Sequence, residues 1–319
     1  MTTGAPLDMV GPHVAAPAGR GDRAAGRPGR LGRLGRLGAW VRLTKPRVIE
    51  LLLVTTVPPM ILAKGGTPSV GLIVGVLVGG ALAAGGANTI NSYLERERDQ
   101  LMARTHDRPL ATGEIRPRYG LLFGLALNVI AFAVLWPAAN LLAACLTITA
   151  TLFYIFVYTI WLKPRTVQNI VIGGAAGAVP VLVGWAAVTE RIGAPSWVLF
   201  AVVFLWTPAH FWALAIRYRD DYANAGFPML PVVRGIRAAT NQIVVYACLT
   251  AFASALLGVF VDVGPLYVGA VIVLGAAFIL LALGLRSNPS SARAIRFFAM
   301  SNVYLLAVFA AVAIDVYTR

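Results

Sequence analysis

Three oxygen-bearing side chains recur at intervals of four residues: Asn91, Glu95 and Asp99. Each step of four on an α-helix turns about 400°, so the three stack on one face within roughly 80° of arc. An amide and two carboxylates offer hard oxygen ligands that suit Mg²⁺ or Ca²⁺, and proteins commonly hold Mg²⁺ with carboxylates together with substrate phosphates. The spacing therefore predicts a metal site for a phosphorylated substrate.

Basic residues follow this face in the same loop. Arg104 and Arg108 would donate hydrogen bonds to the non-bridging oxygens of a diphosphate. An alternative is that the acids are solvated and pair only with neighbouring arginines. Composition weakens that alternative, because the chain has only 13 acidic residues and three of them fall within positions 95–99.

A second charged group, Arg217-Tyr218-Arg219-Asp220-Asp221-Tyr222, follows a later apolar run. Adjacent carboxylates point in different directions on a helix, so we expect one of them to join the metal site and favour Asp221. Arg217 and Tyr222 are candidates for substrate binding. The alternative is that these acidic and basic residues only balance one another's charge and form no binding site.

A histidine inside an apolar helix, His210, is expensive unless it is paired or functional. The sequence leaves four roles open for His210: it could contact an apolar substrate, act as a base, ligate an iron, or be a hydrogen-bonded residue of the core. Further polar residues at the ends of apolar runs could complete a pocket: Lys45, Arg47, Glu50, Lys163, Arg165 and Asn169. For the two lysines, anchoring in lipid headgroups is the alternative.

The elements that position these residues must lie in a membrane. Of 319 residues, 58% are hydrophobic and 13% charged, and the mean hydropathy is +0.76. The sequence contains nine apolar runs long enough to cross a core of about 30 Å as helices. They lie at 47–64, 69–94, 117–137, 139–161, 168–188, 196–216, 240–262, 265–285 and 297–317. The predicted fold class is an all-α integral membrane protein with nine transmembrane helices.

The net charge of +14 comes from basic residues between the runs, mostly in alternate loops. This asymmetry predicts a cytoplasmic N-terminus and the lipid bilayer, with no nucleic acid, as partner. Residues 1–39 are predicted to be a disordered basic tail and 40–319 the membrane domain. A transit peptide is the alternative for the tail, and no cleavable signal peptide is expected. Cys145 and Cys248 fall inside spans, where we expect packing and no disulfide.

Several motifs occur in one order along residues 40–305: Leu43-Thr44-Lys45-Pro46-Arg47, Asn91-xxx-Glu95-xxx-Asp99, Arg104-Thr105, Arg108-Pro109-Leu110, Gln168-Asn169-Ile170-Val171-Ile172-Gly173-Gly174, Thr207-Pro208-Ala209-His210-Phe211-Trp212, Asp221-Tyr222 and Pro228-Met229-Leu230-Pro231. With them the chain resembles the UbiA-type intramembrane prenyltransferases and, within these, the heme O synthases (protoheme IX farnesyltransferases).

The resemblance implies helices around a central cavity and Mg²⁺ bridging the acids of two loops to farnesyl diphosphate. In it, Asn91, Glu95 and Asp99 match the first acidic motif, and Asp221 matches part of the second. The vinyl group of heme B would attack the allylic cation, and water would add to give heme O. His210 occupies the family's histidine position, which implies heme contact or iron ligation.

One departure concerns Glu95, because the family usually has Asp there. Two alternative functions remain: a related prenyltransferase acting on a quinone precursor or chlorophyll, and a secondary transporter of an anionic metabolite. A transporter would place its ion site near the bilayer midplane, whereas these acids lie at an interface. The resemblance also implies a bacterial cell (inner) membrane, or alternatively the mitochondrial inner membrane, with heme A synthase as a partner.

Overall fold

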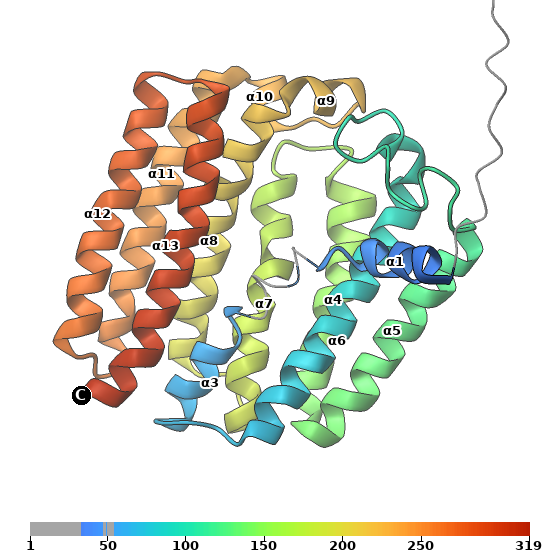
Figure 1. Ribbon diagram of the computed structural model, residues 1–319. Coiled ribbons are helices and arrows are strands. Elements are labelled where there is room, and N and C mark those ends of the chain that lie inside the picture. Colours follow the sequence, from blue (N-terminus) through green and yellow to red (C-terminus); the bar gives the residue numbers. More distant parts are fainter. Residues whose placement is uncertain (1–32, 47–48, 50–53) are drawn as a thin grey trace, which may run out of the picture.

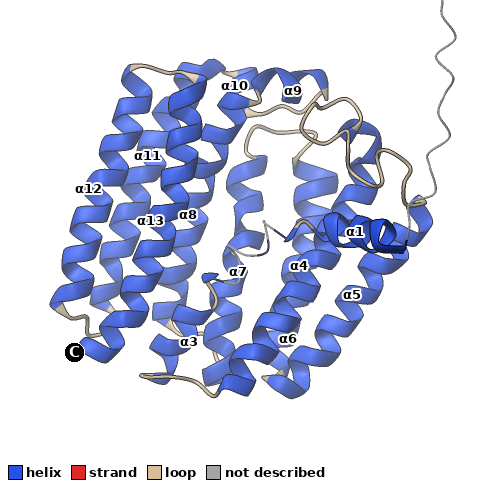
Figure 2. Cartoon of the chain, viewed as in Figure 1, coloured by secondary structure: helices blue, strands red, loops and turns tan. Residues whose placement is uncertain are grey.

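The computed structural model describes residues 33–46, 49 and 54–319. Within this part of the chain every regular element is a helix, as Figure 2 shows, and the predicted all-α membrane class is confirmed. Eight described helices are long and apolar enough to cross a membrane. They are α4 (Val70–Asp99), α5 (Pro117–Ala138), α6 (Leu141–Leu152) continued by η1 (Phe153–Leu162), α7 (Asn169–Thr189), α8 (Ala194–Arg217), α11 (Gly235–Leu256) continued by η2 (Leu257–Val259), α12 (Pro265–Ser287) and α13 (Ser291–Thr318).

These eight helices match eight of the nine predicted runs. The remaining run, 47–64, is represented by α3 (Val57–Lys64), and most of its earlier residues lie outside the described part of the chain. The count of nine spans and the cytoplasmic N-terminus therefore stay predictions. Three boundaries differ clearly from the hydropathy pattern: α4 continues to Asp99, α11 already begins at Gly235, and α13 already begins at Ser291.

Local chemistry explains where several helices begin. Proline occupies the first turn of α5, α8 and α12, where its missing N–H would be unpaired in any case. The side chains of Ser69, Asn140 and Ser290 cap α4, α6 and α13 by accepting a backbone N–H. Six of the eight described spans thus begin at a proline or a capping side chain that is local in sequence.

The spans form a bundle in which α7 lies between two groups of helices (Figure 1). On one side α8 packs against α11 and α13, and α12 packs against the same two; on the other, α4 packs against α5, and α6 joins α5 to α7. At one end of the bundle, uppermost in Figure 1, lie the loop 100–116 and the short helices α9 (Arg219–Asn224) and α10 (Leu230–Val233). The first and second charged segments therefore meet at the same end.

Helix α1 (Arg33–Thr44) crosses in front of α4 and α5. Its buried residues Ala39 and Leu43 pack on Leu110 and Ile115 of the first loop. The helix begins inside the segment predicted to be a disordered tail, while residues 1–32 lie outside the described part, where the tail and its transit-peptide alternative stay predictions. Cys145 and Cys248 are free thiols, as expected, although both are exposed on the bundle surface.

A carboxylate on the last span caps its neighbour. Asp315 of α13 is 3% exposed and accepts hydrogen bonds from the backbone N–H groups of Gly264 (2.8 Å) and Tyr267 (3.1 Å) at the start of α12. Substituting Asp315→Ala should lower the free energy of unfolding by about 2 kcal/mol, because two donors lose their acceptor. Thermal unfolding in detergent measures this. The control is Asp262→Ala, which removes an exposed acid from the loop just before α12. Equal midpoints for the two variants would contradict it.

Candidate active site

Helix α4 carries the first acidic motif through to its last turn. Asn91, Glu95 and Asp99 are 2%, 7% and 3% exposed, so all three point into the protein. The same helix presents Glu97 to solvent, with 81% of its side chain exposed. The four-residue spacing thus separates a buried polar face from an exposed one, and buried carboxylates require charged or hydrogen-bonding partners.

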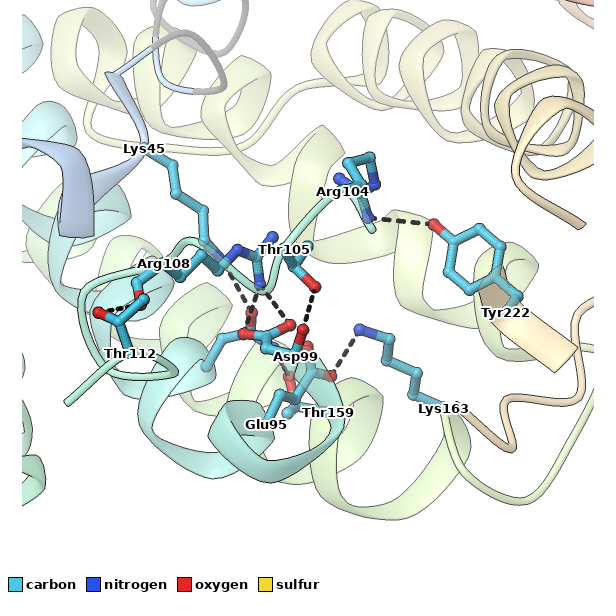
Figure 3. A network of polar contacts seen from close by, with 11 residues as sticks. Lys45, Glu95, Asp99, Arg104, Thr105, Arg108, Thr112, Thr159, Lys163 and Tyr222 are labelled. Atoms are coloured by element: carbon cyan, nitrogen blue, oxygen red, sulfur yellow. Dashed lines mark hydrogen bonds and ion pairs between the residues drawn. The ribbon is translucent and has the colours of Figure 1, made fainter. Parts of the chain in front are cut away.

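Asp99 is paired with the loop that follows it. Arg108 donates from Nη1 to both carboxylate oxygens of Asp99 at 2.8 Å, as Figure 3 shows. The hydroxyl of Thr105 donates to the Asp99 carbonyl at 3.0 Å. Arg104 extends to the second charged segment, where it donates to the Tyr222 hydroxyl at 3.4 Å. The loop 100–116 is thereby folded back over the end of α4 and tied to α9.

Two lysines from other segments reach the remaining members of the motif. Lys163, which follows η1, donates to Glu95 Oε1, and Lys45, which follows α1, donates to Asn91 Oδ1 at 2.9 Å. The Asn91 amide in turn donates to Thr159 Oγ1 at 3.2 Å. Three cations from three separate segments thus surround one helical face, an arrangement suited to an anionic ligand.

Lys45 occupies an unusual position in the backbone. It has φ +56, a left-handed conformation that non-glycine residues adopt rarely and that occurs at functional sites. The preceding carbonyl, that of Thr44, accepts from the Asn88 side chain at 3.0 Å. Burial, with a further contribution from nearby Arg108, holds the pKa of Lys45 well below its usual value. α1 and α4 together hold this ammonium group beside the acidic motif.

The element η1 is a π-helix, a wider coil that frequently marks functional sites. Its wider turn appears in the backbone bond from Lys163 N to the Tyr158 carbonyl at 2.8 Å. The Thr159 hydroxyl also donates to the Tyr154 carbonyl at 2.9 Å. Tyr154 and Tyr158 stack with ring centroids 5.4 Å apart. The Lys163 ammonium also lies 4.6 Å from the centroid of the Phe227 ring, which brings the second loop against the site.

An apolar cavity of about 320 Å³ adjoins this polar cluster, within the usual size of small-molecule sites of about 300–1,000 Å³. Its polar end includes Asn88, Tyr154 and Tyr158, and small side chains of α4 and α7 form its walls. Gly173 allows the Tyr158 ring to approach, because a Cβ there would collide with that ring. From Asn88 to Val76, which also lines the cavity, α4 rises about 18 Å at 1.5 Å per residue.

The side chains present fit a magnesium ion by their chemistry. Asn91, Glu95 and Asp99 supply an amide and two carboxylates on one buried face, the oxygen donors that Mg²⁺ shares with substrate phosphates. Among the described residues, no group of three or more His, Cys, Asp or Glu side chains lies close enough to hold a metal by itself. A phosphorylated substrate would therefore have to provide further ligands.

Comparisons with known proteins identify the family. Residues 52–306 match the model of the UbiA prenyltransferase family. The chain belongs to the UbiA prenyltransferase family. It is 50% identical over 280 residues to "Protoheme IX farnesyltransferase 1" of Saccharopolyspora erythraea, covering 87% of this chain and 89% of that protein. It is 51% identical over 282 residues to "Protoheme IX farnesyltransferase" of Clavibacter michiganensis subsp. michiganensis, covering 87% and 92%.

A solved structure shows the same fold. The UbiA homolog from Archaeoglobus fulgidus bound to GPP and Mg²⁺ superposes with a TM-score of 0.61 at 19% identity, covering 86% of this chain and 99% of that chain. Because it belongs to this family, the chain is a prenyltransferase. The alternative of a secondary transporter is therefore wrong.

The second charged segment of this prenyltransferase meets the first through an aromatic side chain. Tyr222 is 2% exposed, and burial raises its pKa, so its hydroxyl stays protonated beside Arg104. Asp221 is half-buried on α9, and the described contacts of its carboxylate do not include the first motif. Arg217 is exposed, with its guanidinium 5.6 Å from the Tyr218 ring centroid. Metal binding by Asp221 and substrate binding by Arg217 stay predictions.

His210 lies on α8 between two rings. Its centroid is 4.1 Å from that of Trp206 and 4.2 Å from that of Phe298, and Nδ1 is 2.7 Å from Ser301 Oγ. These contacts direct it toward α13, whereas its helical neighbours Thr207 and Phe211 line the apolar cavity. Heme contact or iron ligation by His210 stays a prediction.

One predicted position, Asn169, has no described hydrogen bond to the cluster. Asn169 is fully buried at the start of α7, donates to the Thr166 carbonyl and leaves its side-chain oxygen without a hydrogen-bond partner. Arg47 lies outside the described residues. Conversely, Tyr158 and Phe227 are next to the cluster although their sequence context suggested no role. The only available signal was the density of aromatic residues ahead of Lys163 in η1.

Proposed function

We propose that this prenyltransferase transfers the farnesyl group of farnesyl diphosphate to the vinyl group of heme B and so forms heme O. The relatives that are about half identical to it carry the name protoheme IX farnesyltransferase. Its own structure supports the proposal through one observation: a cluster of cations and acids adjoins an elongated apolar cavity. Such a pair of surfaces suits a diphosphate joined to an isoprenoid chain.

In this proposal the diphosphate lies among Lys45, Lys163 and Arg108, with Arg104 at the edge. Positive charge fixed in a partly buried site stabilises the negative charge that develops on the leaving group. Asn91, Glu95 and Asp99 would hold Mg²⁺, which when bound neutralises further charge on the diphosphate. The structure of the UbiA homolog with GPP and Mg²⁺ supports a metal for this family.

The apolar cavity would hold the isoprenoid chain and keep water from the allylic cation. The carbon–oxygen bond to diphosphate breaks with its electron pair leaving on oxygen. The vinyl carbon of heme B then forms the new carbon–carbon bond, and water adds to the resulting cation with loss of a proton. Rings of Tyr154 and Tyr158 line the polar end of the cavity, where aromatic faces can stabilise a cation.

The proposal also covers the membrane that holds the protein, the acceptor and a partner protein. The eight apolar helices make this a multi-pass membrane protein, and the bacterial relatives favour the bacterial cell membrane over the mitochondrial inner membrane. A quinone precursor or chlorophyll as acceptor is less well supported, because the relatives are named for protoheme. Heme A synthase, a partner that would receive heme O, stays a proposal.

Incubation of the purified protein with heme B, farnesyl diphosphate and Mg²⁺ should yield heme O, detected by mass spectrometry. EDTA should reduce the rate to background because the diphosphate loses its metal, and excess Mg²⁺ should restore it. A quinone precursor offered instead of heme B serves as the control acceptor. Undiminished heme O in EDTA would remove the metal from the proposal, and prenylation of the control acceptor alone would remove heme.

The contact between α1 and the first loop should influence diphosphate binding. Arg42 donates to both carboxylate oxygens of Glu114, at 3.0 and 2.8 Å, three residues before Lys45. The Arg42 side chain is 57% exposed and that of Glu114 19%, and ion pairs near the surface contribute about 0.2–1 kcal/mol. Arg42→Gln should therefore raise KM for farnesyl diphosphate about threefold, leaving KM for heme unchanged, whereas exposed Arg118→Gln should change neither. A selective rise in KM for heme would be inconsistent with this role.

A further inference from the structure

A second, smaller pocket of about 70 Å³ lies among the residues just before α7 and the helices α8, α10 and α11. Its polar lining residues are Gln168, Trp212, Arg234, Gln242 and Tyr246, joined by the apolar Val167 and Leu230. Gln168 directly precedes α7 in the same connection as Lys163. The pocket therefore lies at the end of the bundle that carries the candidate active site, but none of its lining residues belongs to that site or to the apolar cavity.

The lining side chains supply donors that the protein leaves unused. Trp212 is 3% exposed, and its indole nitrogen is buried without a hydrogen-bond partner. Among the described contacts, the guanidinium of Arg234 has neither an ion pair nor a hydrogen bond. No acidic residue lines the pocket. A buried N–H without an acceptor is unfavourable by about 1–3 kcal/mol, so an oxygen ligand here would be stabilising.

The surface next to the pocket indicates where such a ligand comes from. Gln242 shares one face of α11 with Val245, Leu249 and Phe252, which follow at intervals of three and four residues. These three apolar side chains are 48%, 40% and 66% exposed and continue from the pocket along the membrane-spanning part of the helix. A polar pocket at a helix end, followed by an apolar stripe, has the two chemistries of a phospholipid.

We propose that this pocket binds the phosphate group of an anionic phospholipid, with an acyl chain along Val245, Leu249 and Phe252. Arg234 pairs with the phosphate charge, and the Trp212 indole donates one hydrogen bond to a phosphate oxygen. Leu230, in the segment that also carries Phe227, lines the pocket. The bound lipid would therefore contact the second loop through Leu230, three residues after the Phe227 ring that lies beside Lys163. This inference goes beyond the proposed transfer reaction and does not depend on it.

Binding of phosphatidylglycerol to the delipidated full-length protein in detergent tests the site by native mass spectrometry. Arg234→Gln and Trp212→Phe should each weaken binding about tenfold, the second without any change in net charge. Arg237→Gln removes another exposed arginine, in the first turn of α11 and outside the pocket, and should change binding less than twofold. Thermal unfolding without lipid verifies that each variant is folded.

A competition experiment distinguishes a lipid phosphate from a free phosphate ion as the ligand of the pocket. Inorganic phosphate, at matched ionic strength, should compete with phosphatidylglycerol only weakly because it lacks the acyl chain. Phe252→Ser, on the apolar stripe, should weaken lipid binding without affecting phosphate. Equal losses for Arg234→Gln and Arg237→Gln, or unchanged binding by Trp212→Phe, would overturn the proposal in favour of general surface charge. Phosphate binding that depends on Arg234 while lipid binding does not would equally overturn it.

Discussion

Substituting Asp99→Asn should lower kcat/KM for farnesyl transfer about a thousandfold, the loss typical of removing a charged group that organises transition-state electrostatics. Asp99 is 3% exposed and accepts both of its ion-pair bonds from Arg108. An amide of the same size provides one oxygen instead of two, and no charge. The substitution therefore weakens a predicted metal ligand and leaves Arg108 incompletely paired. Heme O formed per minute at saturating heme B measures the effect.

Glu97→Gln is the matched control for this substitution. It removes an acidic charge from the same turn of α4, but its side chain is 81% exposed and pairs with the neighbouring Arg96. We expect less than a twofold change. Asp99→Glu, which retains the charge, should recover part of the activity lost in Asp99→Asn. If Asp99→Asn were within threefold of the unsubstituted protein, Asp99 would not belong to the catalytic site.

Substituting Ala83→Phe should change which isoprenoid chain is accepted. Ala83 is 2% exposed and lines the apolar cavity between its polar end and Val76. A phenyl ring there would shorten the space for the chain, and forcing a farnesyl group past it would cost about 3 kcal/mol, or roughly a hundredfold in kcat/KM. Geranyl diphosphate, one isoprene unit shorter, should lose far less. Initial rates with both diphosphates give the ratio.

The control for the cavity substitution lies on the opposite side of the same helix. Val78 is 46% exposed on α4, so Val78→Phe adds a ring facing away from the cavity and should leave the ratio of the two rates unchanged. Thermal unfolding separates a shorter cavity from a damaged bundle. Equal losses for farnesyl and geranyl diphosphate in Ala83→Phe would show that the cavity does not measure chain length.

The amino-acid sequence by itself determined the spans and one face of the site. Hydropathy over about 20 residues depends only on neighbouring side chains, so eight of the predicted runs agree with described helices. The stacking of Asn91, Glu95 and Asp99 also follows from local geometry, because a four-residue interval fixes their direction on any helix. Their burial at the end of α4 was consistent with that pattern.

Tertiary structure decided which partners these residues meet. Lys45 and Lys163 reach the motif from segments far away in sequence, and the sequence offered headgroup anchoring as an equal alternative for both. The π-helical turn of η1, which directs Tyr158 and Lys163, has no hydropathy signature. The contact of Tyr222 with Arg104 of the first loop also depends on how α9 packs, which the sequence does not reveal.

His210 is another residue for which the sequence determined one property and the tertiary structure another. Its presence within an apolar span was visible in the sequence, but the side of α8 that it faces was not. The structure stacks it between Trp206 and Phe298 and leaves the cavity to Thr207 and Phe211. Periodicity relates residues within one helix, whereas the rotation of that helix about its axis is fixed by packing against its neighbours. For this protein, local spacing determined the motif, and long-range packing decided its ligands and its cavity.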